Sequence, residues 1–155
     1  MNTLFTIALG LFAIVNPFGA IPVFVSLTRN DTYAWKRSQA LRGSIGMVII
    51  LTIFLLIGSY ILQFFSISIS GIRIAGGLII TKYGYDLYSK HQEEEHASPM
   101  VSNDISFSPL AMPMLSGPGS ISFVIGVAAE GGFSSLVFGV GGILLVGVLT
   151  FALLA

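Results

Sequence analysis

The sequence predicts an all-α membrane protein, a polytopic helical bundle with about five spanning helices. Three observations lead to this prediction. Hydrophobic residues make up 54% of the 155 positions and charged residues only 9%, apolar stretches of spanning length follow one another along the chain, and glycine is frequent, as it is in membrane helices. A soluble domain usually carries about 25% charged residues. A chain this poor in charge needs an apolar solvent around it, which a bilayer provides.

The predicted spans follow from length and hydropathy. A spanning helix needs roughly 20 mostly apolar residues, and five stretches reach that length: 4–27, 44–65, 67–88, 107–129 and 133–155. The third is the weakest because it contains Arg73, Lys82 and Asp86. A cleaved signal peptide is the alternative for the first stretch, but it lacks a basic n-region and its apolar run is too long.

Composition and motifs exclude several classes of function. The formal net charge is zero, so there is no electrostatic footprint for nucleic acid. The absence of cysteine removes disulfides, thiolate catalysis and cysteine metal sites. His91 and His96 have the wrong spacing for a His-Glu-x-x-His zinc site, so a solvated loop is the better interpretation. Without a P-loop, a nucleophile elbow or a catalytic carboxylate pair, we expect no enzyme activity, cofactor or metal.

The orientation in the membrane follows from the basic residues of two polar loops, 29–42 and 89–106. Lys and Arg concentrate in cytoplasmic loops. Six cations lie in or near these two loops, and the opposite face has only Arg73 near it. The six are Arg29, Lys36, Arg37, Arg42, Lys82 and Lys90. Both loops are therefore predicted to be cytoplasmic, with the N-terminus outside the cytoplasmic (inner) membrane.

Two matched proline motifs interrupt the first and fourth apolar stretches. The first reads NPFGAIP at 16–22 and the second PMLSGPG at 113–119, so each holds two prolines five residues apart with a glycine between them. A proline removes one backbone N–H and clashes with the carbonyl four residues earlier. Broken backbone at membrane depth is tolerated where protein buries it or a wet cavity meets it. The sequence therefore predicts two broken helices.

The two motifs occupy segments of opposite direction, because the second motif lies three spans further along the chain than the first, an odd number. Paired Pro/Gly-interrupted segments in the two halves of a chain indicate a midplane binding site of a transporter. A pair of ordinary proline kinks is the alternative. The candidate substrate-binding residues are Asn16, Pro17, Gly19, Pro22, Arg73, Pro113, Ser116, Gly117, Pro118 and Gly119.

Two of these candidates have an equally simple structural interpretation. Arg73 lies only about 9 Å along its helix from Ile67 at 1.5 Å per residue, so it can either hold a carboxylate or snorkel to the outer interface. Asn16 can hydrogen-bond the broken backbone, a ligand, or both. Lys82 and Asp86 are four residues apart and can pair on one helix face near the interface.

Three blocks of sequence carry a family resemblance: NPFGAIPVF at 16–24, SISGIRIAGG at 68–77, and PLAMP at 109–113 with GPG at 117–119. In this order they resemble the MarC family of bacterial and archaeal membrane proteins. The resemblance implies two inverted three-helix repeats. One domain, 1–155, would then hold a first repeat 1–88, a cytoplasmic loop 89–106 and a partial second repeat 107–155, which lacks its last helix.

The resemblance implies secondary transport of small solutes, with small neutral amino acids such as glycine and alanine as the best candidates. The breaks suit this chemistry, because half-helix N-termini attract a carboxylate and freed carbonyls suit an ammonium group or Na⁺. The expected partners are thus a small-molecule solute, with Na⁺ or H⁺ as coupling ion, and the lipid bilayer. A non-transporting membrane protein or a truncated, non-functional remnant of the family is the alternative, favoured by the missing sixth segment.

Overall fold

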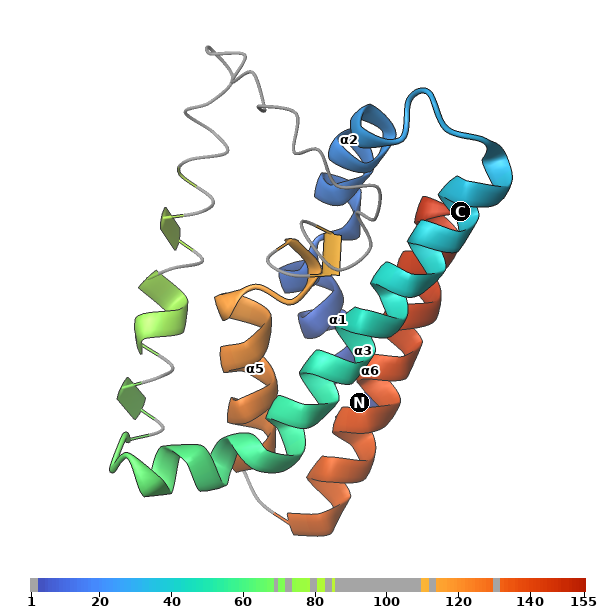
Figure 1. Ribbon diagram of the computed structural model, residues 1–155. Helices are drawn as coiled ribbons and strands as arrows, with labels where there is room; N and C mark the ends of the chain where they lie inside the picture. The colour runs from blue at the N-terminus through green and yellow to red at the C-terminus, as the bar shows by residue number, and fades with distance from the viewer. Residues whose placement is uncertain are drawn as a thin grey trace.

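The computed structural model is a bundle of helices (Figure 1). It describes residues 3–68, 70–71, 74–78, 81–82, 85, 110–111, 114–129 and 132–155. The elements among them are α1 (Thr3–Val15), α2 (Pro17–Leu27), α3 (Tyr33–Phe64), α5 (Pro118–Ala129) and α6 (Gly132–Leu154). Every one of these described elements is a helix, as the composition predicts.

Two helices, α3 and α6, are long and apolar enough to cross a membrane, and α1 with α2 forms a third candidate span bent by 40°. The predicted spans 4–27, 44–65 and 133–155 therefore correspond to helices. Among the described residues of the predicted span 107–129, the α-helix begins at Pro118, and α5 is too short to cross a bilayer alone. The predicted span 67–88 is described only in part.

The polar loop predicted at 29–42 is wrong over most of its length. Residues 28–32 make the connection, and α3 begins at Tyr33. Lys36, Arg37 and Arg42 thus lie on a helix. Hydropathy marks only the apolar part of a helix, whereas Lys, Arg, Gln and Ala are all good helix formers in water. At 1.5 Å per residue the 32 residues of α3 span about 48 Å, well beyond a hydrocarbon core of about 30 Å. The second predicted loop, 89–106, lies outside the described residues.

Helices α3 and α6 run antiparallel and form the centre of the bundle (Figure 1). A Cβ atom placed on Gly139 would lie 2.9 Å from Leu55 Cδ1, and one on Gly147 would lie 2.5 Å from Val48 Cγ2. Lipid tails are as apolar as the helix surfaces, so van der Waals contact at small residues drives helix association in membranes. The two glycines of α6 therefore let the larger side chains of α3 approach the backbone of α6.

The segment around α5 runs along α3 in the same direction. Gly46 lies against Ala111, and Gly58 lies against Ile125. On the other side of α6, Gly142 accommodates Ile7 and the backbone of Ala8. The buried core that joins these helices includes Leu11, Met47, Leu51, Leu55, Leu115, Ile143 and Val146.

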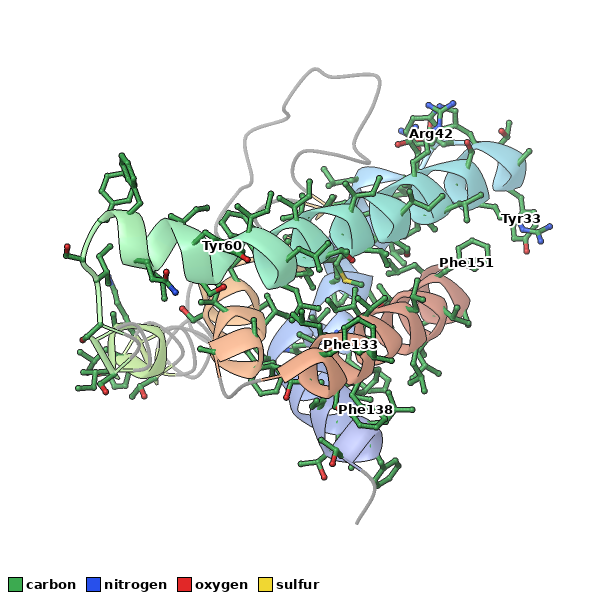
Figure 2. The ribbon with its side chains drawn as sticks, turned by 90° about the horizontal axis from the view of Figure 1, so that it is seen from below. Tyr33, Arg42, Tyr60, Phe133, Phe138 and Phe151 are labelled. Atoms are coloured by element: carbon green, nitrogen blue, oxygen red, sulfur yellow. The ribbon has the colours of Figure 1, made fainter. Side chains whose placement is uncertain are left out.

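The outward surface of the bundle is apolar (Figure 2). Ile53 and Leu56 of α3 are each 48% exposed, and Val148 of α6 is 67% exposed. Figure 2 shows Tyr33 at the first end of α3 and Arg42 further along the same helix, on another side. Contiguous apolar surface on this scale is rare on soluble monomers. It fits a helix surface that faces lipid, with the charged end of α3 reaching the polar interface.

We predict that Gly147→Ala destabilises the protein by about 1–3 kcal/mol, the usual range for overpacking, because its Cβ would collide with Val48. Adding Val48→Ala should recover a large part of this loss, since it removes the colliding atom. Gly77→Ala is the control, because nothing lies within 4 Å of a Cβ at Gly77. Thermal unfolding of the purified chain in detergent measures all three. A Gly147→Ala variant as stable as Gly77→Ala would contradict this packing.

Candidate functional site

The first break is built around Asn16. Its backbone has φ 47° and ψ 61°, the left-handed conformation, which Asn adopts more readily than most residues. The Asn16 N–H donates to the Phe12 carbonyl at 3.0 Å and completes α1. The Asn16 Oδ1 accepts the Gly19 N–H at 3.3 Å and caps α2. One asparagine therefore ends one helix and begins the next.

The residues after Asn16 fit this cap. Pro17 is the first residue of α2, where its missing N–H has no intrahelical acceptor to lose. Gly19 is required because a Cβ there would lie 2.7 Å from Asn16 Nδ2. The rings of Phe12 and Phe18 meet edge to face across the break, with centroids 5.8 Å apart, and help to hold the bend.

Pro22 does not break the helix as the motif predicts. It lies inside α2, which continues to Leu27. Since Pro22 has no N–H, the carbonyl of Phe18, four residues earlier, has no intrahelical donor. The break is thus confined to Asn16, and Pro22 contributes a freed carbonyl one turn into α2.

The second break lies at Ser116 and Gly117, between a π-helical turn and α5. The Ser116 N–H donates to the Ala111 carbonyl five residues earlier at 2.9 Å, a pattern that is often found at functional sites. The Ile121 N–H donates to the Gly117 carbonyl at 3.1 Å. Gly119 and Ser120 come before Ile121 in the first turn of α5. Their N–H groups therefore have no carbonyl acceptor within the helix. Pro118, the second proline of the motif, begins α5.

The hydroxyl of Ser116 is buried and unused. Ser116 is 1% exposed, and its Oγ has no hydrogen-bond partner among the described residues. By contrast, the Ser120 hydroxyl donates to the Leu115 carbonyl at 3.3 Å. A buried polar group without a partner costs about 1–3 kcal/mol. Ser116 is therefore the side chain at this break that is free to bind a ligand.

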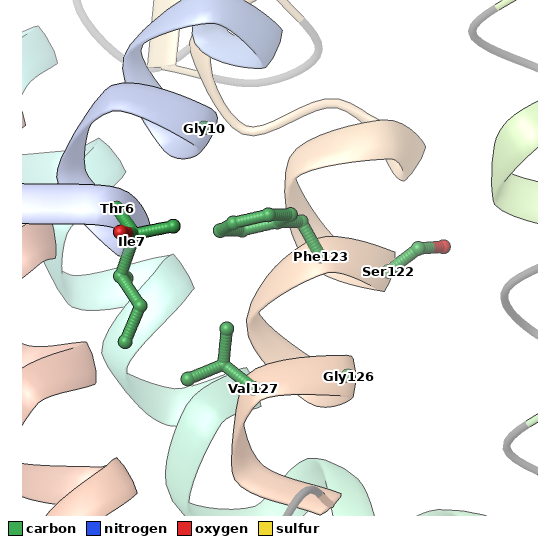
Figure 3. A pocket seen from close by; sticks show the side chains of 7 residues that line it. All are labelled: Thr6, Ile7, Gly10, Ser122, Phe123, Gly126 and Val127. Atoms are coloured by element: carbon green, nitrogen blue, oxygen red, sulfur yellow. The ribbon is translucent and has the colours of Figure 1, made fainter. Parts of the chain in front are cut away.

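The packing of α1 against α5 relates the levels of the two breaks. Figure 3 shows the two helices facing each other across a pocket, with the Phe123 ring pointing toward α1 below Gly10, at the height of Thr6, and with Val127 near Ile7. The helices are thus antiparallel. Six residues beyond Gly10 lies Asn16, and six residues before Phe123 lies Gly117. Both steps correspond to about 9 Å along a helix, and from this equal spacing we infer that Asn16 and Gly117 lie at similar levels along the two helices.

The second break also lies deep in the bundle. Ala111 contacts Gly46 and Ile125 contacts Gly58, so residues 116–117 lie between these two levels of α3. Both glycines belong to the uncharged part of α3. The structure thus places seven of the predicted site residues at two breaks: Asn16, Pro17, Gly19, Ser116, Gly117, Pro118 and Gly119, with Pro22 one turn further along α2. Of these, Pro17, Ser116 and Gly119 are buried, whereas Gly19, Pro22 and Pro118 are exposed.

Several predicted positions lie outside the described residues: Arg73, Pro113, Asp86, His91 and His96. The two interpretations of Arg73 and the predicted pairing of Asp86 with Lys82 remain predictions. The pocket between α1 and α5, of about 400 Å³, is a feature that the sequence did not reveal. Its walls come from segments more than a hundred residues apart, and no local motif marks such a contact.

Comparison with known proteins places these observations in a family. The family described as MarC family integral membrane protein matches residues 1–155. The chain is 40% identical over 127 residues to UPF0056 membrane protein YhcE of Escherichia coli, an alignment that covers 78% of this chain and 59% of the relative. It is 34% identical over 128 residues to UPF0056 membrane protein YvbG of Bacillus subtilis, covering 78% and 61%. The chain thus spans about three-fifths of these relatives. No solved structure matches.

We predict that Asn16→Ala lowers the free energy of unfolding by about 1–3 kcal/mol. It removes a helix cap, worth about 1 kcal/mol, and forces alanine into the left-handed region, which costs about 1–2 kcal/mol. Asn16→Gly tolerates that backbone and should cost less than about 1 kcal/mol. Chemical unfolding of the purified chain measures both.

Thr32→Ala is the matched control, because Thr32 stands at the N-cap of α3 without a side-chain capping bond. Its stability should equal that of the wild type. If Asn16→Ala were as stable as Thr32→Ala, or Asn16→Gly as unstable as Asn16→Ala, the role assigned to Asn16 would be wrong.

Proposed function

Because the chain belongs to the MarC family of integral membrane proteins, we propose that it forms the solute site of a secondary transporter at the level of its two broken helices. The single observation that carries this proposal is the buried, unpartnered Ser116 hydroxyl at the second break. The approach of Phe123 to Gly10 supports placing the Asn16 break at a similar level. The relatives are longer than this chain, and the proposal concerns the site that these residues form.

The two breaks offer different chemistry, which suits a zwitterion. At the second break, the N–H groups of Gly119 and Ser120 stand at the positive end of α5 beside the free Ser116 hydroxyl, so this break favours a carboxylate. At the first break, Asn16 already caps α2, and the freed Phe18 carbonyl favours an ammonium group. A small neutral amino acid carries both groups.

The glycines at the breaks favour the smallest amino acids. Gly19 has no room for a Cβ beside Asn16, and Gly117 and Gly119 flank the first residue of α5. Short backbone-lined sites leave little space for a substrate side chain. Glycine and alanine are therefore the first substrates to test, with Na⁺ or H⁺ as the coupling ion.

The arrangement also supports alternating access in the inner membrane. The α1–α2 segment and α5 run in opposite directions across the bundle, as the register of Gly10 against Phe123 requires. Inverted repeats at 1–88 and 107–155 would rock against each other around a site between them. In this orientation the charged start of α3 faces the cytoplasm, and the face at which α5 ends and α6 begins is outside.

We predict that Ser116→Ala weakens binding of glycine or alanine at least about tenfold, because a hydrogen bond to a charged group is worth about 1.5–3 kcal/mol. The same change should leave thermal stability unchanged or raised, since the hydroxyl has no partner in the protein. Equilibrium binding of radiolabelled amino acid to the purified chain measures the first effect, and thermal unfolding the second.

Ser134→Ala is the control, since Ser134 is exposed on α6. It should bind as the wild type does. A stable Ser116→Ala variant with wild-type affinity would disprove the Ser116 site. A wild type that binds neither amino acid would disprove the proposed substrate class.

A further inference from the structure

A pocket of about 400 Å³ lies between α1 and α5, on one side of the two breaks (Figure 3). Its lining residues are Thr6, Ile7, Gly10, Ser122, Phe123, Gly126 and Val127. Val127 is two residues from the end of α5, so the pocket starts near the face at which α5 ends and α6 begins. We call this face the α5–α6 face. Between α1 and α5 the lining reaches Gly10 and Ser122, the lining residues nearest in sequence to the two breaks.

Phe123 closes the inner end of this pocket. A Cβ on Gly10 would lie 2.9 Å from the Phe123 ring carbon Cζ, so the ring occupies the space that a side chain at position 10 would need. In the antiparallel register, this contact lies between the Ile7–Val127 level of the pocket and the Asn16–Gly117 level of the breaks. The ring therefore lies between the pocket and the level of the breaks.

The Phe123 ring has room to move away from Gly10. Phe123 is only half-buried and packs at the edge of the core. Gly126, three residues further along α5, lines the same pocket and presents no side chain there. In Figure 3 the neighbouring Ser122 points away from α1, toward the position at which a Cβ on Gly76 would meet it at 2.7 Å. Phe123 is therefore the side chain whose movement can open or close the space between α1 and α5.

We propose that this pocket is the entry vestibule for small zwitterionic solutes and that Phe123, seated on Gly10, is the gate between the vestibule and the breaks. The inference rests on the proposed function and adds a route and a gating residue to it. A lipid chain is the other occupant that an apolar pocket could take. Water reaches the breaks through the pocket only if it is a vestibule, so accessibility to a charged reagent separates the two.

The test uses Ser116→Cys as a reporter, because the chain has no other cysteine and Ser116 is buried at the second break. The protein is reconstituted in vesicles, and a membrane-impermeant methanethiosulfonate is added to each side in turn. With the gate closed, Ser116→Cys should react slowly from the α5–α6 face. Adding Phe123→Ala should raise the rate from that face at least about tenfold. Adding Gly10→Ala instead places a Cβ in the space that the Phe123 ring occupies and displaces the ring. It should therefore raise the rate of Ser116→Cys modification as well.

Ile125→Ala is the matched control. Ile125 lies on the same helix but contacts Gly58 of α3, so its removal loosens α5 without opening the pocket. Equal acceleration by Ile125→Ala and Phe123→Ala would overturn the gate, as would an unchanged rate in both Phe123→Ala and Gly10→Ala, the result expected of a lipid-filled pocket. Acceleration only from the opposite face would overturn it too. A wild type that binds no amino acid, with the acceleration present, would instead count against the proposed substrate and leave the gate standing.

Discussion

In the apolar interior of a bilayer, a backbone N–H or carbonyl group without a partner costs several kcal/mol, and this constraint governs both interruptions of the bundle. The first interruption satisfies it locally, through the backbone and side chain of Asn16. The second satisfies it with a π-helical bond from Ser116 to Ala111 and with the Ser120 hydroxyl on Leu115. The Ser116 hydroxyl is the side-chain group at these breaks that keeps no hydrogen-bond partner among the described residues. In the proposed site, the ligand supplies that partner.

The difference between the two breaks is the main functional consequence. Two identical breaks would attract the same charge twice. Here the Asn16 cap occupies the positive end of α2, while the positive end of α5 stays open, and the proposed site rests on this difference in charge preference. The packing glycines hold this arrangement in place: Gly10 admits Phe123 between α1 and α5, and Gly58 admits Ile125 between α3 and α5. The contact of Ile125 with Gly58 thus holds α5 against α3, while Phe123 fills the space between α5 and α1.

The sequence predicted the first break well because its determinants are local. Asparagine tolerates the left-handed backbone and proline starts a helix, so Asn16-Pro17 specifies a cap by itself. The second break could not be located to the residue, because both prolines of its motif can begin a helix and the choice of Pro118 depends on tertiary contacts such as Ala111 on Gly46. The start of α3 was misplaced because the apolar pattern covers only the part of the helix that lies within the bilayer. The helix itself continues beyond the bilayer as a charged segment. The contact of Gly10 with Phe123 could not be predicted, since 18 glycines and 12 phenylalanines allow many such pairs.

The register of α1 against α5 can be measured by cross-linking Ile14→Cys to Gly119→Cys, which lie one helical turn from Gly10 and Phe123 toward the breaks. A disulfide forms only when the Cα atoms are closer than about 7 Å. If the two breaks lie at one level, this pair cross-links efficiently under mild oxidation. Ile14→Cys should then form no cross-link with Val127→Cys, which lies two turns away from position 119 along α5. Cross-linking of the second pair without the first would contradict the register and, with it, the paired site.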